Sequence, residues 1–486
     1  MINFKQVSYT IGTLLCIESF FLLLSSGVSL YYNEYDLPAF LLSFLITLFA
    51  GTLLVNFAGK RQKTMGRKEG LLVVSSTWFV FSLFGALPFY ISRGIPVYVD
   101  AFFETVSGFT TTGSSLIEDL DSFPHGLLFW RSLIQWLGGM GIVVFTLAVL
   151  PLLTSSSGGL YLFNFESTGL VHSKLRPRID ETAKRLWGLY VLITLIVTFL
   201  LCIGPMDFFD ALCHSLTTAA TGGYSTKNIG VAYWNSPYTE WVIGFFMLLS
   251  GSNFTLIFLL LHGKIRKVFA DEEWRSYLFL ILCSSLIVCA VLQYYYFFEK
   301  SFFETLRISF FQVTSAVTST GFSIGNELYW GNFLFTFFLF LMLIGGSSGG
   351  TAGGIKVIRF IVLIKNAVNE FHRNVRPNVI VPVRINRQVV SIELVFRVLA
   401  FLSVYVGIVI FSLMLLSLFD IPFERNLEMV ISALGNMGFS LGGRCSSTTY
   451  LELSPFVKCY LAVIMVVGRL ELFTVLTLFT PYYWKR

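Results

Sequence analysis

The sequence predicts an all-α polytopic membrane protein. Four parallel helix–pore-loop–helix repeats are expected to surround a pseudo-fourfold pore, and two extra N-terminal transmembrane helices are expected to precede them. Three observations support this fold class: a strongly apolar composition, a strict alternation of basic and charge-poor linkers, and a glycine-centred motif that recurs four times along the chain.

The composition establishes the membrane class. Of the 486 residues, 55% are hydrophobic and 13% are charged, and the mean hydropathy is +0.74. Soluble domains carry roughly 25% charged residues. Apolar runs long enough to span a bilayer lie near residues 11–31, 38–58, 71–91, 126–152, 186–204, 238–262, 276–298, 333–344 (continuing past 355), 394–418 and 455–479. Shorter, hydroxyl-rich segments that predict re-entrant elements lie near residues 97–112, 207–222, 302–320 and 423–437.

Charge predicts the orientation. Four linkers together carry 21 Lys and Arg, and the four that alternate with them carry 6. The basic linkers are residues 60–68, 172–186, 263–275 and 355–387, and the others are residues 92–125, 205–237, 299–332 and 419–455. Because basic loops stay in the cytoplasm, both termini are expected there and the re-entrant segments at the outer face. The basic linkers could serve orientation and lipid contact alone, or could also dock a partner.

The four charge-poor linkers share a motif. They align on Gly113, Gly223, Gly321 and Gly438. Six positions earlier stand Ser107, Thr217, Ser315 and Ser432, and two positions later stand Ser115, Ser225, Ser323 and Ser440. Four ordinary hairpin turns could share a glycine by chance, but four matches between apolar helices indicate an internal repeat. The predicted units are residues 1–60 (the N-terminal helices), 61–155, 156–265, 266–370 and 371–486.

The loop composition suggests a chemistry. Glycine permits the positive φ that turns carbonyl groups toward an axis, and converging rings of carbonyl oxygens can replace a cation's hydration shell. No ring of carboxylates lies at the aligned glycines, which favours a monovalent cation. The predicted filter residues are Thr110, Thr111, Thr112, Gly113, Ala220, Thr221, Gly222, Gly223, Thr318, Ser319, Thr320, Gly321, Gly435, Asn436, Met437 and Gly438.

Two further features lie below the predicted filter. Six glycines fall within residues 345–354 and must interrupt an inner helix: Gly345, Gly346, Gly349, Gly350, Gly353 and Gly354. The segment does not fit a phosphate-binding Walker A loop; it is interpreted as a gate or, alternatively, as a packing kink. Arg469 lies in the last apolar helix, where a charge normally faces water or a partner; the alternative is that it snorkels to the cytoplasmic surface.

Several stretches resemble a known family. They are S-G-F-T-T-T-G-S-S, A-A-T-G-G-Y-S-T, T-S-T-G-F-S, G-N-M-G-F-S, G-G-S-S-G-G-T-A-G-G-I-K and G-R-L-E-L-F-T. Over essentially the whole chain the sequence resembles the Trk/Ktr/HKT superfamily of potassium transporters, and within it the Trk type (TrkH-like).

The resemblance implies that the four filter glycines select K⁺, that the glycine-rich insert is a mobile intramembrane loop and that Arg469 lies near the ion path. Plant relatives that prefer sodium carry serine at the first site, so Gly113 argues for potassium. Repeat 4 departs most, with Asn436 and Met437 where repeat 1 has threonines.

The resemblance also implies a setting. It places the chain in the cytoplasmic (inner) membrane, as a homodimer, with a separate cytosolic nucleotide-binding ring subunit as regulatory partner. The basic linkers, above all residues 355–387, would offer the docking surface. No nucleic-acid partner and no cofactor in this chain is expected: the seven cysteines and five histidines are dispersed, without disulfide or metal spacing. Glu18, alone in the first apolar helix, receives no role.

Three function hypotheses follow. The first is a potassium-selective, channel-like uptake transporter. The second is an alternating-access secondary cation transporter coupled to H⁺ or Na⁺, although that class usually shows inverted repeats. The third is a membrane enzyme, for which the helices offer no carboxylate pair, histidine cluster or activated nucleophile. Coupling to a proton or sodium gradient stays open.

Overall fold

The computed structural model describes residues 2–59, 66–148, 179–295, 301–324, 330–376, 379, 381–438 and 447–485. The first helices are α1 (Phe4–Tyr32) and α2 (Leu37–Ala58). Repeat 1 contains α3 (Arg67–Gly85), α4 (Leu87–Ile91), α5 (Tyr98–Phe109) and α6 (His125–Ala148). Repeat 2 contains α9 (Ile179–Ile203), α10 (Phe208–Ala220), η1 (Gly230–Trp234), α11 (Pro237–Ser250) and α12 (Phe254–Leu261).

Repeat 3 contains α13 (Ile265–Ala270), α14 (Glu272–Tyr295), α15 (Phe302–Val317), α16 (Gly331–Leu343) and α17 (Val357–Val375). Repeat 4 contains β1 (Arg384–Ile385), β2 (Gln388–Val389), α18 (Ile392–Ser417), α19 (Phe423–Gly435), α20 (Ser447–Leu451), α21 (Pro455–Arg469), α22 (Phe473–Leu476), η4 (Thr477–Phe479) and α23 (Pro481–Trp484). The predicted boundaries at 60/61 and 155/156 lie outside the described residues, and those at 265/266 and 370/371 fall inside α13 and α17.

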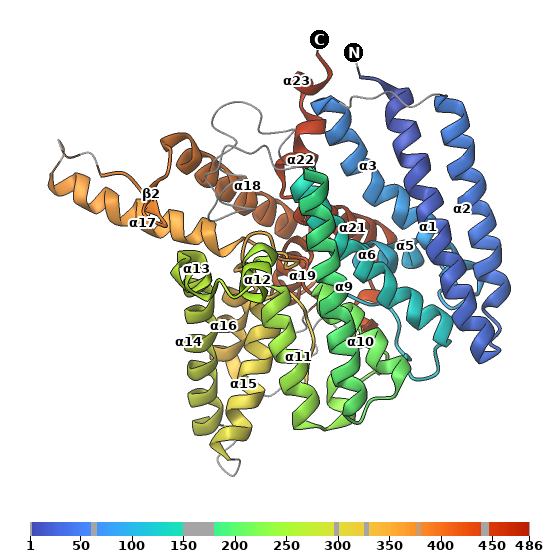
Figure 1. Ribbon diagram of the computed structural model, residues 1–486, viewed down its shortest axis with the longest axis horizontal. Coiled ribbons are helices and arrows are strands. Elements are labelled where there is room, and N and C mark those ends of the chain that lie inside the picture. Colours follow the sequence, from blue (N-terminus) through green and yellow to red (C-terminus); the bar gives the residue numbers. More distant parts are fainter. Residues whose placement is uncertain are drawn as a thin grey trace.

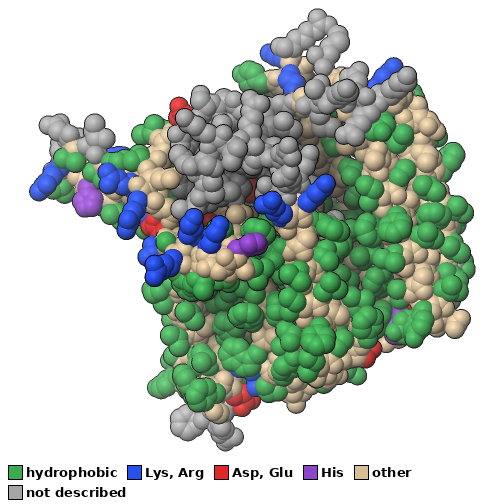
Figure 2. All heavy atoms as spheres, in the orientation of Figure 1, with side chains coloured by type: hydrophobic (Ala, Val, Ile, Leu, Met, Phe, Trp, Pro, Cys, Tyr) green, Lys and Arg blue, Asp and Glu red, His purple; other side chains and the backbone are tan. Residues whose placement is uncertain are grey.

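The long helices have the length and composition of membrane spans. Six described helices are long and apolar enough to cross a bilayer, or eight if each of two bent pairs counts as one span. Helices α6 and α16 occupy the other two predicted segments. Figure 2 shows the lower part of one face covered mainly by hydrophobic side chains, with Lys and Arg gathered mainly above them. The chain is therefore a polytopic, all-α membrane protein.

The four semi-polar segments form short helices, as the sequence predicts. Helices α5, α10, α15 and α19 have 12, 13, 16 and 13 residues, too few to cross a bilayer. Each packs against longer helices: α5 against α6 and α21, α10 against α6 and α9, α15 against α14 and α11, and α19 against α21 and α18. A large apolar core packs α5 and α6 against α19 and α21, so repeats 1 and 4 share it.

The inner helices are more broken than the sequence predicts. The predicted break between α16 and α17 is present, and residues 344–356 are not helical. The spans predicted as continuous at 238–262 and 455–479 are also bent, by 109° between α11 and α12 and by 108° between α21 and α22. At the first bend the Asn253 side chain caps α12 by accepting from Thr255 N at 2.8 Å. At the second, Glu471 and Leu472 adopt φ of 55° and 57°.

One small element was not predicted. Within the basic linker at 355–387 and just beyond it, β1 and β2 form an antiparallel hairpin. Its turn residues Asn386 and Arg387 have φ of 48° and 65°, the left-handed conformation that two-residue hairpins require. With α17 the hairpin projects sideways from the body of the protein (Figure 1).

The two termini lie side by side (Figure 1). The Tyr483 hydroxyl donates to the Lys68 carbonyl oxygen at 2.7 Å, and Lys68 Nζ donates to the Lys485 carbonyl oxygen at 2.7 Å. The last helix, α23, is thereby attached to the start of α3.

Two ion pairs with little solvent exposure join neighbouring repeats. Lys458 of α21 lies 2.7 Å from Asp100 of α5, and Arg307 of α15 lies 2.7 Å from Glu240 of α11. Both pairs connect an inner helix to the short helix of the next repeat, with the charges reversed. An uncompensated charge in such a site costs far more than an exposed one.

We predict that Lys458→Met destabilises the protein by about 3–5 kcal/mol, because it leaves the Asp100 carboxylate buried without its partner. The Asp100→Asn/Lys458→Met double variant should recover part of the loss. The measurement is thermal stability of detergent-purified protein. The control is Arg425→Gln: its pair with Glu452 is exposed and 4.0 Å long, so a change below about 0.5 kcal/mol is expected. Equal effects of Lys458→Met and Arg425→Gln would contradict the prediction.

Candidate functional site

The four short helices end in the same backbone turn. The residue two positions before each aligned glycine adopts a left-handed conformation, with φ of 54°, 52°, 52° and 51° at Thr111, Thr221, Ser319 and Asn436. Gly113, Gly223 and Gly321 follow with φ of 85°, 79° and 89°. Non-glycine residues rarely adopt positive φ. Its recurrence at matching positions in four segments shows that the sequence repeat is also a structural repeat.

Exposure follows the same repeat. The three residues before each aligned glycine are buried, and Gly113, Gly223, Gly321 and Gly438 themselves are partly exposed. The buried hydroxyl-bearing members are at most 3% exposed. Each loop therefore presents its glycine at an accessible surface and buries the side chains before it.

The loops lie side by side without room for side chains. A Cβ at Gly113 would clash with the carbonyl oxygen of Gly222, and a Cβ at Gly223 would clash with that of Thr320. A Cβ at Gly438 would meet the carbonyl carbon of Gly113. Loops 4, 1, 2 and 3 are thus neighbours in that order. This close backbone approach explains the glycines physically.

The hydrogen bonds of the loops depart from fourfold symmetry. Repeats 1 and 3 match: Thr110 and Thr112 share a hydroxyl–hydroxyl hydrogen bond of 2.8 Å, and Thr318 and Thr320 one of 2.7 Å. In loop 2, the Gly222 carbonyl oxygen accepts a hydrogen bond of 2.7 Å from Gln135 Nε2. This bond occupies one of the two lone pairs of the oxygen.

In repeat 4, Asn436 Nδ2 donates to Thr112 Oγ1 at 3.1 Å and to the Met465 carbonyl oxygen at 2.7 Å. This departure was expected from its sequence.

Backbone dipoles make the centre of the loops electronegative. Helices α5, α10, α15 and α19 end at Phe109, Ala220, Val317 and Gly435, directly at the loops. The C-terminus of a helix carries a partial negative charge, and the sixteen predicted filter residues include no ionisable side chain. Four helix C-termini around one centre favour a cation, and the field comes from dipoles rather than from carboxylates.

The glycine-rich insert lies directly beneath the loops. Thr351 Oγ1 donates to the Ala219 carbonyl oxygen at 3.2 Å and accepts from Thr221 Oγ1 at 3.1 Å. The Gly353 N–H donates to Ser319 Oγ at 2.5 Å. A Cβ at Gly353 would clash with the Gly435 carbonyl oxygen. The insert therefore contacts the loops of repeats 2, 3 and 4.

The backbone of the insert is satisfied by the bend in repeat 2. Ser347 N donates to the Gly251 carbonyl oxygen at 2.9 Å and Thr351 N to that of Ser250 at 3.2 Å, while Phe254 N donates to the Gly349 carbonyl oxygen at 3.2 Å. Glu273 Oε1 accepts from Ser348 N at 2.7 Å. The two broken inner helices thus supply each other with hydrogen-bond partners that lipid cannot provide.

Arg469 joins the insert to repeat 1. Its side chain is buried, with 2% exposure, so it does not reach the surface. The NH1 group donates to the Thr351 carbonyl oxygen at 2.8 Å, and NH2 donates to that of Gly138 in α6 at 3.3 Å. The guanidinium therefore lies between the insert and an inner helix.

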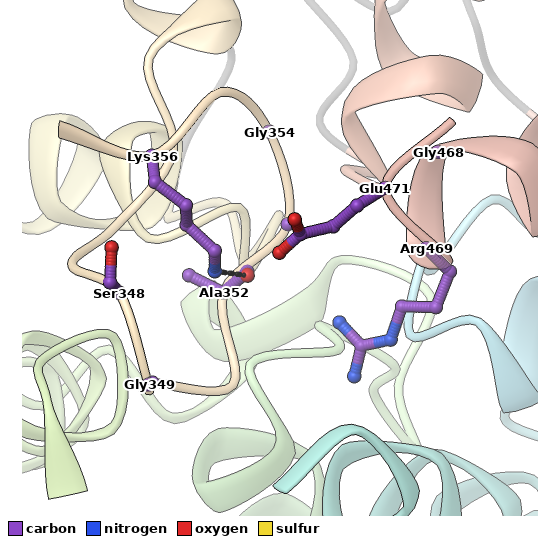
Figure 3. A pocket seen from close by; sticks show the side chains of 10 residues that line it. Ser348, Gly349, Ala352, Gly354, Lys356, Gly468, Arg469 and Glu471 are labelled. Atoms are coloured by element: carbon purple, nitrogen blue, oxygen red, sulfur yellow. Dashed lines mark hydrogen bonds between the residues drawn. The ribbon is translucent and has the colours of Figure 1, made fainter. Parts of the chain in front are cut away.

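A small cavity of about 30 Å³ lies between the insert and the end of α21. Lys356 and Glu471 extend toward one another across it (Figure 3). The Lys356 ammonium donates to the Ala352 carbonyl oxygen, and Arg359 pairs with Glu471. The insert is thus bordered by charged groups of α17 and of the bend after α21.

Sequence reasoning missed several of these contacts. Glu471 is neutralised by Arg359, 112 positions away, which sequence spacing does not show. Arg131 carries the same signal as Arg469, a charge within an apolar run, but was not singled out. It lies beside the residues that follow the aligned glycines and contacts Glu104 and Ser225.

Glu18 remains without a role. It is 1% exposed, and neither carboxylate oxygen has a hydrogen-bond partner among the described residues. Across the described part of the chain no group of three or more His, Cys, Asp or Glu could hold a metal ion. Ser440, of the sequence motif, lies outside the described residues.

A polytopic bundle in which four re-entrant helices converge on glycine loops defines a membrane protein of the pore-loop class. The similarity of this chain to known proteins indicates a particular family within this class. Residues 36–486 match the TrkH family model, described as "Cation transport protein". The chain therefore belongs to the TrkH family.

Individual relatives align over nearly their full length. The chain is 35% identical to the Trk system potassium uptake protein TrkH of Escherichia coli K12, covering 99% of this chain and 100% of the relative. It is also 35% identical to TrkH of Halomonas elongata, with both chains covered fully. The crystal structure of the potassium transporter TrkH from Vibrio parahaemolyticus superposes with a TM-score of 0.89 at 31% identity, covering 99% of this chain and 100% of that one.

We predict that Gly138→Ala destabilises the protein although alanine favours a helix by about 1 kcal/mol. The new Cβ would clash with the Phe109 carbonyl oxygen at the end of α5, and forced backbone shifts cost about 1–3 kcal/mol. Thermal stability of purified protein measures the outcome. Gly407→Ala in α18 is the control, because nothing lies within 4 Å of its Cβ position. A Gly138→Ala protein as stable as Gly407→Ala would refute the tight contact.

Proposed function

We propose that the protein is a potassium-selective, channel-like uptake transporter that moves K⁺ across the cytoplasmic membrane. The observation that carries this proposal is the fourfold recurrence of one arrangement. A short helix directs its C-terminus at the centre, a left-handed residue turns the chain, and a glycine follows at an accessible surface. Helix dipoles and backbone carbonyl groups together suit a dehydrated monovalent cation.

Potassium is favoured over other cations by two considerations. The aligned relatives are named potassium uptake proteins, and the first loop carries Gly113, not the serine of sodium-preferring plant relatives of the superfamily. The sixteen filter residues predicted from the sequence are retained in this proposal. The Gly222 carbonyl oxygen would contribute only its second lone pair to a cation, because the first accepts the hydrogen bond from Gln135.

The glycine-rich insert is proposed as the gate. It packs beneath three of the four loops through Thr221, Ser319 and Gly435, a position that obstructs a path along the axis. Its glycines at 345, 346, 349, 350, 353 and 354 allow rearrangement without side-chain barriers. Arg469 would hold it closed through the Thr351 carbonyl oxygen.

The proposed membrane location, orientation and partners are inferred from the family and from the distribution of charge. Multi-pass insertion in the inner membrane, with both termini cytoplasmic, agrees with the basic linkers. A homodimer and a cytosolic nucleotide-binding ring subunit are further parts of the proposal. The projecting α17 and hairpin carry Lys365, Arg373, Arg376, Arg384 and Arg387, and we propose this surface for the ring subunit.

An alternating-access transporter coupled to H⁺ or Na⁺ is the second candidate. The buried, broken inner helices of repeats 2, 3 and 4 are the feature that favours it, since such transporters use interrupted helices. Purified protein in liposomes with an imposed potential separates the two. Rubidium uptake driven by potential alone, unchanged by proton or sodium gradients, supports the channel-like mechanism. Uptake that requires either gradient overturns it.

We predict that Gly113→Ser raises sodium permeation relative to rubidium. The side chain would collide with the Gly222 carbonyl oxygen at a residue with φ of 85° and so displace the ring. Flux ratios in liposomes measure this. Gly263→Ser is the control, because Gly263 has φ of 71° with open space around it. Unchanged ratios in Gly113→Ser, Gly321→Ser and Gly438→Ser alike would remove the filter assignment.

We predict that Arg469→Ala increases rubidium flux per folded protein. It removes the hydrogen bond to the Thr351 carbonyl oxygen and a fixed positive charge that repels cations. Arg469→Lys keeps the charge but loses the planar fork, so an intermediate flux is expected. Rubidium uptake normalised to folded protein is the readout. Wild-type flux in Arg469→Ala would mean that this residue neither holds the insert nor faces the path.

A further inference from the structure

Buried polar side chains form one connected cluster behind the residues that follow Gly113 in loop 1 and Gly223 in loop 2. These following residues are called the outer limbs of the loops. Glu104 of α5 is 0% exposed and accepts three hydrogen bonds, from Ser115 Oγ at 3.0 Å, Leu116 N at 2.8 Å and Arg131 Nε at 2.9 Å. Ser115 and Leu116 lie directly after Gly113 and its neighbour. The chain leaving the first loop is therefore fixed to the helix that enters it.

Arg131 of α6 connects this limb to the next loop. Its NH2 group donates to Ser115 Oγ at 3.0 Å, and its NH1 group donates to the Ser225 carbonyl oxygen at 3.2 Å. The guanidinium stacks 4.1 Å from the centre of the Tyr224 ring, and the Tyr224 hydroxyl donates to the Glu104 carbonyl oxygen at 2.9 Å. Loops 1 and 2 are thus cross-linked through one buried charge pair.

One turn further along α6, Gln135 clamps the peptide groups of loop 2. Its Nε2 donates to the Gly222 carbonyl oxygen at 2.7 Å, and its Oε1 accepts from Tyr224 N at 3.2 Å. Gln135 is 0% exposed. The carbonyl group before Gly223 and the N–H group after it are therefore both held by one side chain of repeat 1.

The same brace recurs in repeat 2 with different chemistry. Nine positions before the aligned glycines stand Glu104, His214, Gln312 and Met429. His214 Nε2 lies 3.0 Å from Ser225 Oγ, as Glu104 lies 3.0 Å from Ser115 Oγ. His214 Nδ1 lies 2.8 Å from the Asp210 carbonyl oxygen, which only accepts. The proton is therefore on Nδ1, and Nε2 accepts from the serine hydroxyl.

We propose that Glu104, Arg131, Gln135 and His214 are positioning residues that set ion selectivity by fixing the outer limbs of loops 1 and 2. The inference rests on the proposed filter function. A sodium ion needs its oxygen ligands to move inward, and a loop tied to its helix by buried hydrogen bonds resists that movement. Repeat 4 carries Met429 at the corresponding position, and a thioether side chain cannot hold its loop by hydrogen bonds of this kind.

The test compares rubidium-to-sodium flux ratios and thermal stability in liposome-reconstituted protein. Gln135→Met and His214→Leu keep volume and remove the hydrogen bonds. Each should lower the ratio by at least about fivefold, the factor that a single hydrogen bond of ordinary strength contributes. His214→Gln restores an acceptor and is the residue that repeat 3 carries here, so its ratio should stay near wild type.

Thr198→Val is the matched control. It removes a buried 2.5 Å hydrogen bond between the hydroxyls of Thr198 in α9 and Ser215 in α10, and Ser215 is the residue directly after His214. It should lower stability without changing the ratio. Wild-type ratios in both Gln135→Met and His214→Leu overturn the proposal, as does the same fall in Thr198→Val.

Gly113→Ser, measured alongside, distinguishes two failures. If Gly113→Ser alone lowers the ratio, the filter assignment is supported and the proposed positioning role of these side chains is wrong. If it too leaves the ratio unchanged, the filter assignment falls with the brace. Should His214→Leu not fold, Gln135→Met and His214→Gln still decide the outcome, because a lowered ratio in the first and a retained ratio in the second are both required.

Discussion

Every interruption of a helix at membrane depth leaves N–H and C=O groups that must find partners inside the protein, because lipid offers none. This constraint organises the centre of the molecule. The bend between α11 and α12 and the insert between α16 and α17 exchange three backbone hydrogen bonds, through Ser250, Gly251 and Gly349. Each break thus supplies hydrogen-bond partners to the other.

The same constraint couples the loops to the insert. Thr221 and Ser319 have the left-handed conformation that turns the chain after each short helix, and the hydroxyls of both also bond to the insert. The conformation of these loops and the position of the insert therefore depend on shared atoms. The insert continues directly into the projecting helix α17, so that helix is covalently joined to the residues beneath the loops.

Backbone geometry is conserved among the four repeats, whereas the side-chain support is not. The left-handed residue recurs in all four with φ between 51° and 54°. Repeats 1 and 3 each contain a hydrogen bond between two threonine hydroxyls, whereas loop 2 is held by Gln135 and loop 4 by Asn436. The Thr111 hydroxyl is buried without a hydrogen-bond partner among the described residues. A single chain can place a different support behind each loop, which four identical subunits cannot.

The sequence by itself determined the membrane class, the short helices, the register of the four loops and the break at residues 344–356. These depend on local composition, on length and on glycine, which act within a few residues of where they occur. The tertiary structure alone decided the bends after Ser250 and Arg469, the pairing of Lys458 with Asp100 and of Arg359 with Glu471, and the cluster around Arg131. Those features require contacts between separate elements, such as that of Arg131 with Ser225 of the next repeat, or stabilisation of broken backbone by another repeat. Hydropathy and spacing do not encode which distant groups meet, because that is fixed only when all four repeats close around one axis.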